Sequence, residues 1–281
     1  MKNRKTVYYG VFELPVFNQM LVDIGANLTH ESFKDDIDLV LLSARKEEIS
    51  HLVVTGASLT GSFEALSLAE AYPDLLYATA GIHPHHAEET NEEALTKLRI
   101  LASNEKVKAI GETGLDFFRD LSPRDVQVQS FEAHIELAIE TGLPMFLHER
   151  DAYPTFAEVL KKYRNQLGQV VVHCFTGERA AMHAYLDLDC SIGITGWICD
   201  ERRGVHLLDL VKDIPDDRLM IETDSPYLMP RTIRPKPKTR RNEPKNLTYV
   251  CDTIAQCRGQ SYAKVASLSS ANAIKFFGLA T

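Results

Sequence analysis

The sequence lacks any apolar run that approaches the roughly 20 residues of a membrane-spanning helix. The apolar segment at residues 7–12 is short, Glu13 follows it, and no small-residue cleavage site appears, so we expect no signal peptide. Cysteine is scarce: there are five, an odd number, and none of them forms a CxxC pair. Separate thiols of this kind are typical of a reduced compartment, so we expect a cytoplasmic protein with no membrane partner.

Positive charge is also in short supply. The net charge of -8 means that the molecule as a whole does not attract nucleic acid or an anionic membrane. Charges are screened over about 8 Å at physiological salt, however, so a local basic patch can act against this background. Residues 230–244 form such a patch, with six Lys or Arg residues and one acid between prolines.

Eight short apolar runs, each followed by a segment with helical periodicity, organise the chain. This alternation predicts parallel strands covered by helices. The runs are 20–24, 51–54, 76–82, 107–110, 144–147, 170–172, 191–194 and 218–221. Between the fourth and fifth runs, Ser122 is the expected N-cap, Pro123 the first residue and Gly142 the end of a helix.

Eight such units favour a single closed (β/α)8 barrel of the TIM type over an open doubly wound sheet. Polar residues follow nearly all of the runs, and a barrel gathers all its strand ends around one mouth, whereas an open sheet uses only the strands at its switch point. We assign residues 20–281 to one barrel domain and residues 1–19 to an N-terminal extension outside the fold, with Met20 as an alternative start.

Five ionisable residues follow five different runs: His83, Glu112, His148, His173 and Asp224. Each alone has a structural explanation, because a histidine after a strand is often hydrogen-bonded and Asp224 can cap a turn. Together at one mouth they form a set of imidazole and carboxylate groups that suits a divalent metal ion. We therefore favour a metal site over a purely structural network.

Longer motifs carry a family resemblance that runs from about residue 20 to residue 279. They are GIHPH (81–85), AIGETGLD (109–116), FLHER (146–150), VHCFTG (172–177), GITGWICDERRG (193–204), IETDSPYL (221–228) and RRNEP (240–244). With these motifs in this order, the chain resembles the TatD family of metal-dependent nucleases. The resemblance implies a TIM-type barrel of the amidohydrolase superfamily and 3′–5′ exonuclease action on single-stranded DNA or RNA. It also implies Mg2+ or Mn2+ as cofactor and a part in DNA repair or degradation.

By this resemblance Glu112, His148 and His173 are metal ligands, Asp224 is a ligand or a proton acceptor, and His83 lies at the same mouth. Glu112, Asp224 and His83 are the expected catalytic residues. The chemistry agrees, because phosphodiester hydrolysis needs a more acidic water and positive charge near the phosphate oxygens. Glu112 is the most plausible bridge between two ions, if two are bound.

The expected partner is single-stranded DNA or RNA, bound by a monomeric protein. The basic segment at residues 230–244 can neutralise phosphates without sequence preference, or it is simply a solvated loop. Aromatic rings that follow strands, such as Phe117 and Phe118, can stack on bases or belong to the core. Asn242 and Glu243 could instead lock the segment to the barrel. The candidate substrate contacts are His85, Arg119, Arg150, Trp197, Arg202, Arg240 and Arg241.

Two other functions remain open on the sequence alone. The first is a metal amidohydrolase that acts on a small substrate. Such enzymes usually have His-x-His on the first strand and often a lysine on the fourth. This chain has Gly25 and Asn27 at the first place and Glu112 at the second, and both differences disfavour this function. The second is a nucleic-acid-binding barrel without catalysis. Asp23 and Asn27 are expected to give the metal at most an oxygen ligand or a water-mediated contact. The site therefore has few nitrogen ligands, which suits Mg2+ better than Zn2+.

Overall fold

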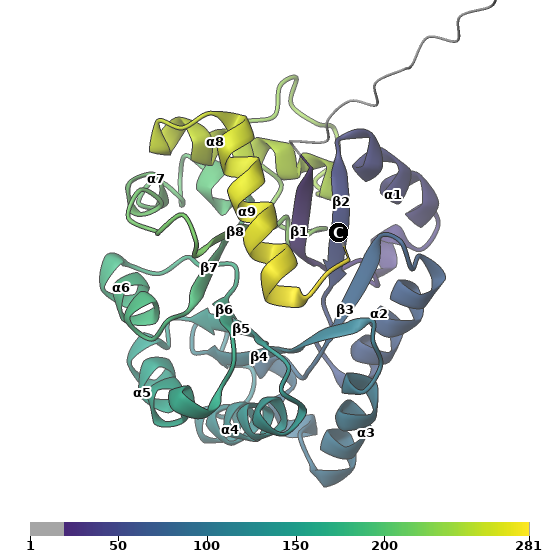
Figure 1. Cartoon of the computed structure of the whole chain (residues 1–281), viewed down its shortest axis with the longest axis vertical. Helices are drawn as coiled ribbons and strands as arrows, with labels where there is room; N and C mark the ends of the chain where they lie inside the picture. Colours follow the sequence, from purple (N-terminus) through teal and green to yellow (C-terminus); the bar gives the residue numbers. More distant parts are fainter. Residues whose placement is uncertain (1–19, 281) are drawn as a thin grey trace, which may run out of the picture.

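A computed structural model describes residues 20–280, and the extension predicted at residues 1–19 lies outside the described residues. Eight parallel strands follow one another around a barrel in chain order (Figure 1). They are β1 (Leu21–Ala26), β2 (Ile49–Val54), β3 (Leu76–Ala80), β4 (Val107–Asp116), β5 (Met145–Arg150), β6 (Val170–Val172), β7 (Ser191–Ile194) and β8 (Leu219–Ile221). The predicted (β/α)8 fold is therefore confirmed.

The ends of the barrel sheet meet where β1 approaches the segment after β8. The backbone N–H of Asp224 donates to the carbonyl of Gly25 at 2.9 Å, and that of Asn27 donates to the carbonyl of Ser225 at 2.7 Å. These bonds place the residues that follow the first and last strands side by side at the mouth.

All helices but α9 (Tyr262–Phe277), which lies across one end of the barrel, cover its outside (Figure 1). The others are α1 (Ile37–Lys46), α2 (Leu59–Ala71), α3 (Glu92–Ala102), α4 (Arg124–Thr141), α5 (Tyr153–Tyr163), α6 (Arg179–Asp187), α7 (Leu207–Leu210) and α8 (Leu247–Arg258). Short 3-10 turns are η1 (Glu31–Phe33), η2 (Pro84–Glu89), η3 (Arg164–Gln166), η4 (Gly196–Cys199) and η5 (Pro244–Asn246). Within the described residues, no helix is long and apolar enough to cross a membrane.

The barrel interior has its own apolar core, separate from the core beneath the helices. Inward side chains from seven strands pack there against Phe276 and Phe277 of α9. The hydroxyl of Ser270, also in α9, donates to the carbonyl of Met20 just before β1, so α9 closes the N-terminal end of the barrel. The opposite end, where the strands finish, is left for the polar residues.

Some predicted boundaries were wrong by a few residues. β4 extends to Asp116 and not to Ile110, because pairing with β5 continues through Gly114 opposite His148 and Asp116 opposite Arg150. Pro123 has an extended ψ of 138° and is the N-cap, so α4 begins one residue later than predicted. The hydroxyl of Ser122 donates instead to the carbonyl of His85, whereas Gly142 ends α4 with a left-handed φ of 70° as predicted.

Candidate metal centre

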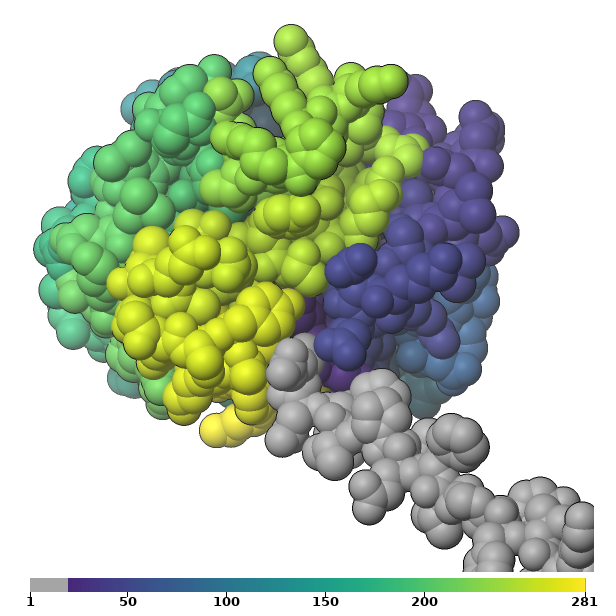
Figure 2. Space-filling view, turned by 90° about the horizontal axis from the view of Figure 1, so that it is seen from above, coloured from purple at the N-terminus to yellow at the C-terminus, as the bar shows by residue number. Residues whose placement is uncertain are grey.

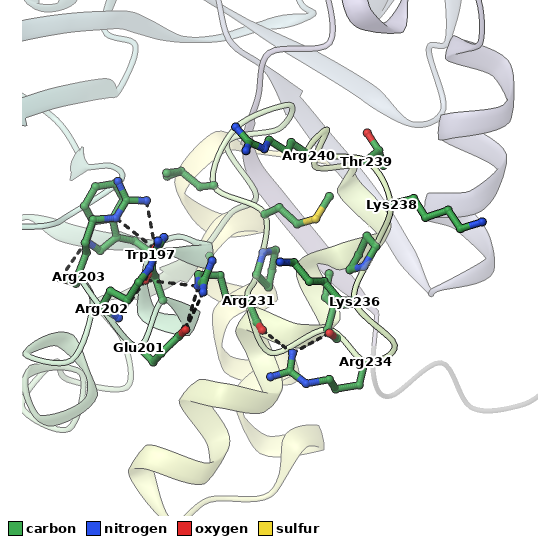
Figure 3. Close-up of a pocket in the computed structure, with 17 residues that line it drawn as sticks. Trp197, Glu201, Arg202, Arg203, Arg231, Arg234, Lys236, Lys238, Thr239 and Arg240 are labelled. Carbon is green, nitrogen blue, oxygen red and sulfur yellow. Dashed lines mark hydrogen bonds and ion pairs between the residues drawn. The ribbon is translucent and has the colours of Figure 1, made fainter.

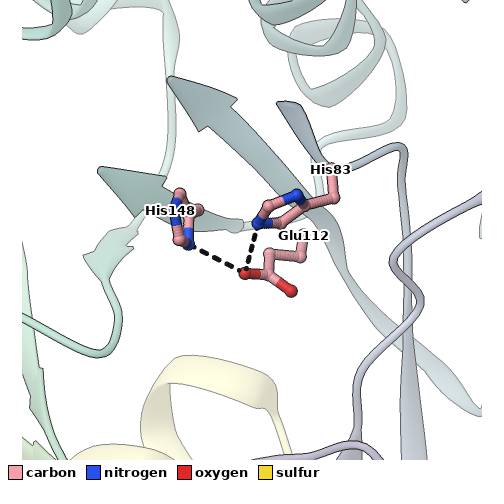
Figure 4. A group of neighbouring side chains, drawn as sticks. All are labelled: His83, Glu112 and His148. Atoms are coloured by element: carbon pink, nitrogen blue, oxygen red, sulfur yellow. Dashed lines mark hydrogen bonds and ion pairs between the residues drawn. The ribbon is translucent and has the colours of Figure 1, made fainter. Parts of the chain in front are cut away.

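Glu112 occupies the centre of the mouth, and three histidines surround its carboxylate. Its Oε1 lies 3.4 Å from His83 Nε2, 3.1 Å from His148 Nδ1 and 2.8 Å from His173 Nε2. Glu112 belongs to β4 and His148 to β5, whereas His83 follows β3 and His173 follows β6. The groups therefore come from four successive strands or the loops after them, and Figure 4 shows His83, Glu112 and His148. The structure thus brings together four of the five residues predicted for the metal site or catalysis.

The donor set fits a divalent metal ion. His83, Glu112 and His148 each offer one ligand atom, and these atoms all lie within 4.8 Å of one another. The Nε2 atom of His148 is buried and has no hydrogen-bond partner among the described residues, although Asp116 Oδ2 lies 3.4 Å away. A buried polar atom without a partner costs free energy, which coordination would recover.

The charges at this site are strongly coupled. Burial alone would raise the pKa of Glu112, but the imidazoles of His83 and His173 outweigh it and hold that pKa well below its usual range. Burial opposes the charged form of His173, yet the carboxylates of Glu112 and Glu222 raise its pKa well above the ordinary value. Burial lowers the pKa of His83 well below its usual range. The negative charge of Glu112 therefore favours a proton on the neighbouring His173. A metal cation bound in the mouth would take the place of that proton.

A second carboxylate, Asp116 at the end of β4, lies beside the first. Its Oδ2 is 2.8 Å from His85 Nε2, and its Oδ1 accepts the backbone N–H groups of Phe118 and Arg119. Burial opposes its ionisation, but the neighbouring imidazoles of His148 and His85 lower the pKa of Asp116. His85, a predicted substrate contact, is thus oriented by Asp116.

Asp224 lies on the far side of the mouth, after β8. Its Oδ1 accepts a hydrogen bond from the side-chain amide of Asn27 at 2.8 Å, and its φ of 52° is in the left-handed region. Burial raises the pKa of Asp224 to about 7. Among residues 20–280, the group of three close ligand atoms includes neither Asp224 nor His173.

Glu222 is a functional candidate that the sequence did not single out. Its carboxylate is fully buried, and it accepts a hydrogen bond from His173 Nδ1 at 3.3 Å and from the backbone N–H of Cys174 at 2.5 Å. Carboxylates that hold the outer nitrogen of a metal-binding histidine orient the ring and raise its basicity. The position of Glu222 directly after β8, two residues before Asp224, was the available signal.

Glycines make room for the Glu222 carboxylate. A Cβ atom at Gly25 would lie 2.4 Å from Glu222 Oε2, and one at Gly193 would lie 2.9 Å from Glu222 Oε1. Asp23, on the same strand as Gly25, is buried and accepts from the backbone N–H and the hydroxyl of Thr223, and burial raises its pKa to about 8. Asp23 thus links β1 to the segment after β8, and its carboxylate oxygens are engaged by Thr223 and not by the metal centre.

The predicted substrate contacts divide into two groups. Arg150 lies over the rings of Phe118, 4.4 Å from its centroid, and Trp197, 5.1 Å from its centroid, and so belongs to the mouth. Arg119 is exposed just after β4, and Arg240 lines a pocket beside Trp197.

The guanidinium groups of the second group are already engaged. That of Arg202 pairs with Asp200, and that of Arg241 pairs with Asp36 and Glu243. These contacts indicate that Arg241 anchors the basic segment to the barrel, which is the role expected for Glu243. Arg240 is therefore the better candidate for a phosphate contact.

Known proteins resemble this chain over nearly its whole length. Residues 22–278 match the model of the family described as TatD related DNase. A Pantoea ananatis protein named 3′-5′ ssDNA/RNA exonuclease TatD is 45% identical over 259 residues, which are 92% of this chain and 100% of the relative. An Erwinia amylovora protein of the same name is 47% identical over 259 residues, again 92% and 100% of the two chains.

Solved structures agree with these sequence matches. The hydrolase TatD family protein from Entamoeba histolytica has a TM-score of 0.84 and 28% identity, over 92% of this chain and 98% of its own. YJJV, a TatD homolog from Escherichia coli K12, has a TM-score of 0.85 and 25% identity, over 94% and 100% of the two chains.

Proposed function

The chain belongs to the TatD-related DNase family, and from this we propose that it is a metal-dependent exonuclease that removes nucleotides from the 3′ end of single-stranded DNA or RNA. The observation that carries the proposal is the carboxylate of Glu112 within 3.4 Å of three imidazole nitrogens at a barrel mouth. A role in DNA repair or degradation, a cytoplasmic location and a monomeric state are further parts of the proposal.

Glu112, His148 and His173 are the ligands that the motifs indicate, and His83, whose ligand atom groups with those of Glu112 and His148, would hold the metal with them. Asp224 lies at the edge of the site. When bound, a divalent ion supplies positive charge for the phosphate oxygens and makes a water molecule more acidic. Mg2+, or Mn2+, is the proposed ion, because the carboxylates suit a hard cation and β1 offers no imidazole.

The chain's own residues then bind and move protons. Asp224 is the proposed acceptor for the proton of the attacking water, and the amide of Asn27 fixes one oxygen of that carboxylate. His83 lies against the same carboxylate as the metal ligands and is the proposed catalytic neighbour of the scissile phosphate. His85, held by Asp116, and Arg150, held between two rings, are proposed to orient the nucleotide that leaves.

The test is a digest of 3′- and 5′-labelled single-stranded oligonucleotides with Mg2+, Mn2+ or a chelator. We expect loss of label from the 3′ end only when metal is present, and a fall of at least 100-fold in Glu112→Gln and His148→Ala. Glu149→Gln is the matched control, since Glu149 is a buried glutamate in the same strand as His148 that binds Tyr185 and the Ala152 N–H instead.

The two remaining alternatives give different results. Hydrolysis of a cyclic amide but not of an oligonucleotide would point to the amidohydrolase function. Tight oligonucleotide binding without metal-dependent hydrolysis would point to a silent binding barrel. Unchanged nuclease activity in both Glu112→Gln and His148→Ala would show that the site assignment is wrong.

A further inference from the structure

A basic pocket lies next to the metal centre, between the residues that follow β7 and those that follow β8. Its volume is about 920 Å3, near the upper end of the ~300–1,000 Å3 typical of small-molecule pockets. Trp197 and residues up to Arg203 form one wall, and residues 228–240 form the other (Figure 3). The second wall is the yellow-green segment whose long side chains project from the surface in Figure 2.

The pocket is strongly cationic in a chain that is acidic overall. Seven of its lining residues are Arg or Lys, and only two, Asp200 and Glu201, are acids. Both acids are already paired, Asp200 with Arg202 and Arg203, and Glu201 with Arg231.

The cations of the second wall face solvent without this neutralisation. Lys236, Lys238 and Arg240 are exposed, and none of them has a carboxylate within 4.0 Å in the part of the chain that the structure describes. Among residues 20–280, the partners of the Arg234 guanidinium are the backbone carbonyls of Arg231 and Ile233. Unpaired positive charges in a concave site attract a polyanion, and this attraction weakens as the salt concentration rises.

A row of alternating rings and guanidinium groups connects the pocket to the metal centre. The guanidinium carbon of Arg150, two residues after His148, lies 4.4 Å from the Phe118 ring centroid and 5.1 Å from that of Trp197. The guanidinium carbon of Arg203 lies 4.3 Å from the Trp197 centroid. Rings of this kind stack on bases of any sequence, and arginine adds to the stacking.

We propose that this pocket binds the part of a single strand that lies 5′ to the nucleotide being removed, with phosphates against Lys236, Lys238 and Arg240 and a base against Trp197. The proposal rests on the proposed function, because it places the 3′ end at Glu112. A base that stacks on Trp197 takes the place of one guanidinium, which then reaches a flanking phosphate. The enzyme is therefore selective for strands long enough to cover both sites, irrespective of sequence.

The test measures binding separately from cleavage. Fluorescence anisotropy with labelled dT2, dT4, dT8 and dT12, in chelator, gives the affinity and its salt dependence for the full-length chain. We expect Lys236→Ala plus Lys238→Ala to weaken dT12 binding at least tenfold and to reduce the slope of log K against log salt by about 1.4, the value for two single-strand phosphates. Lys161→Ala plus Lys275→Ala, two exposed lysines on α5 and α9, is the matched control and should leave both quantities as in the wild type.

Stacking is tested at the ring. Trp197→Ala should weaken dT12 by roughly 5- to 100-fold and Trp197→Phe by much less. An abasic strand of twelve sugar-phosphates should bind wild type as weakly as dT12 binds Trp197→Ala. An abasic strand or a polyglutamate that binds as tightly as dT12 would overturn the nucleic-acid assignment of the pocket.

Cleavage of the shortest substrates separates the two proposals. Metal-dependent hydrolysis of dT4 by the wild type, together with an unchanged dT12 affinity and salt slope in the double lysine variant, would refute the pocket and leave the nuclease function standing. Salt-sensitive dT12 binding that depends on the two lysines, without hydrolysis of any length, would support strand binding in the pocket, but it would refute the nuclease function and with it the placement of the 3′ end at Glu112.

Discussion

Replacement of Glu222 by glutamine should weaken metal binding, although Glu222 is not proposed as a ligand. Its two carboxylate oxygens accept from two donors, His173 Nδ1 at 3.3 Å and the Cys174 N–H at 2.5 Å. Glutamine has a single acceptor oxygen, so one of these buried donors loses its partner, and the negative charge that favours a basic His173 disappears. His173 Nε2, which faces Glu112 at 2.8 Å, is then a poorer ligand and less firmly oriented.

Loss of such an outer carboxylate typically costs 10- to 100-fold in metal affinity, which is about 1.4–2.7 kcal/mol. We expect a fall of this size in the affinity of Glu222→Gln for Mn2+, measured by calorimetric titration of the purified, metal-stripped protein at fixed pH. Gly25→Ala should act in the same direction, because its Cβ would lie 2.4 Å from Glu222 Oε2 and must push that carboxylate away.

Glu149→Gln is the control, since it alters a glutamate of equal burial class in β5 that contacts neither His148 nor His173 through its carboxylate. It should lower thermal stability without a change in Mn2+ affinity. A Glu222→Gln protein with wild-type circular dichroism and a dissociation constant within twofold of wild type would refute the reasoning that Glu222 supports the metal site through His173.

Two further predictions concern stability. Arg241→Ala should lower the free energy of unfolding by about 1–2 kcal/mol, because the partly buried guanidinium loses Asp36 and Glu243; Arg240→Ala should leave the melting temperature unchanged, and equal melting temperatures for the two variants would exclude the anchoring role. Burial lowers the pKa of His134 to about 4, against 6.5 when exposed. The unfolded chain therefore binds this proton first, so stability is full above about pH 6.5 and falls towards pH 4, by up to ~1.4 kcal/mol per pH unit. His134→Gln should flatten this part of the profile in thermal melts, and an unchanged slope would contradict the assignment.

The strands could be predicted from sequence because each parallel strand is buried on both faces and therefore appears as a continuous apolar run. Six of the eight predicted strands end within two residues of the observed ends, from Leu21–Ala26 to Leu219–Ile221. The exceptions are β4 and β5, whose last residues, apart from Leu115, are polar or glycine. Their pairing, with Gly114 opposite His148 and Asp116 opposite Arg150, is a tertiary contact that periodicity does not encode.

From the sequence, we could predict which residues belong to the site, because they follow strands, but not what each of them does there. Barrel topology ensures that those residues meet, so His83, Glu112, His148 and His173 could be grouped without coordinates. What each side chain does once there depends on its neighbours. Arg240 and Arg241 are indistinguishable by composition, yet Arg241 pairs with Asp36, which is 205 positions away in the chain.

The first strand illustrates the same limit and shows why it brings no histidine. Even a Cβ atom at position 25 would lie 2.4 Å from Glu222 Oε2 and 3.0 Å from Phe146 Cζ, so a histidine there would have to displace the buried Glu222 carboxylate. Asn27, at the other position of the expected pair, instead donates to Asp224. β1 therefore contributes supports in place of ligands: space for the carboxylate that orients His173, and a hydrogen bond that holds the proposed proton acceptor.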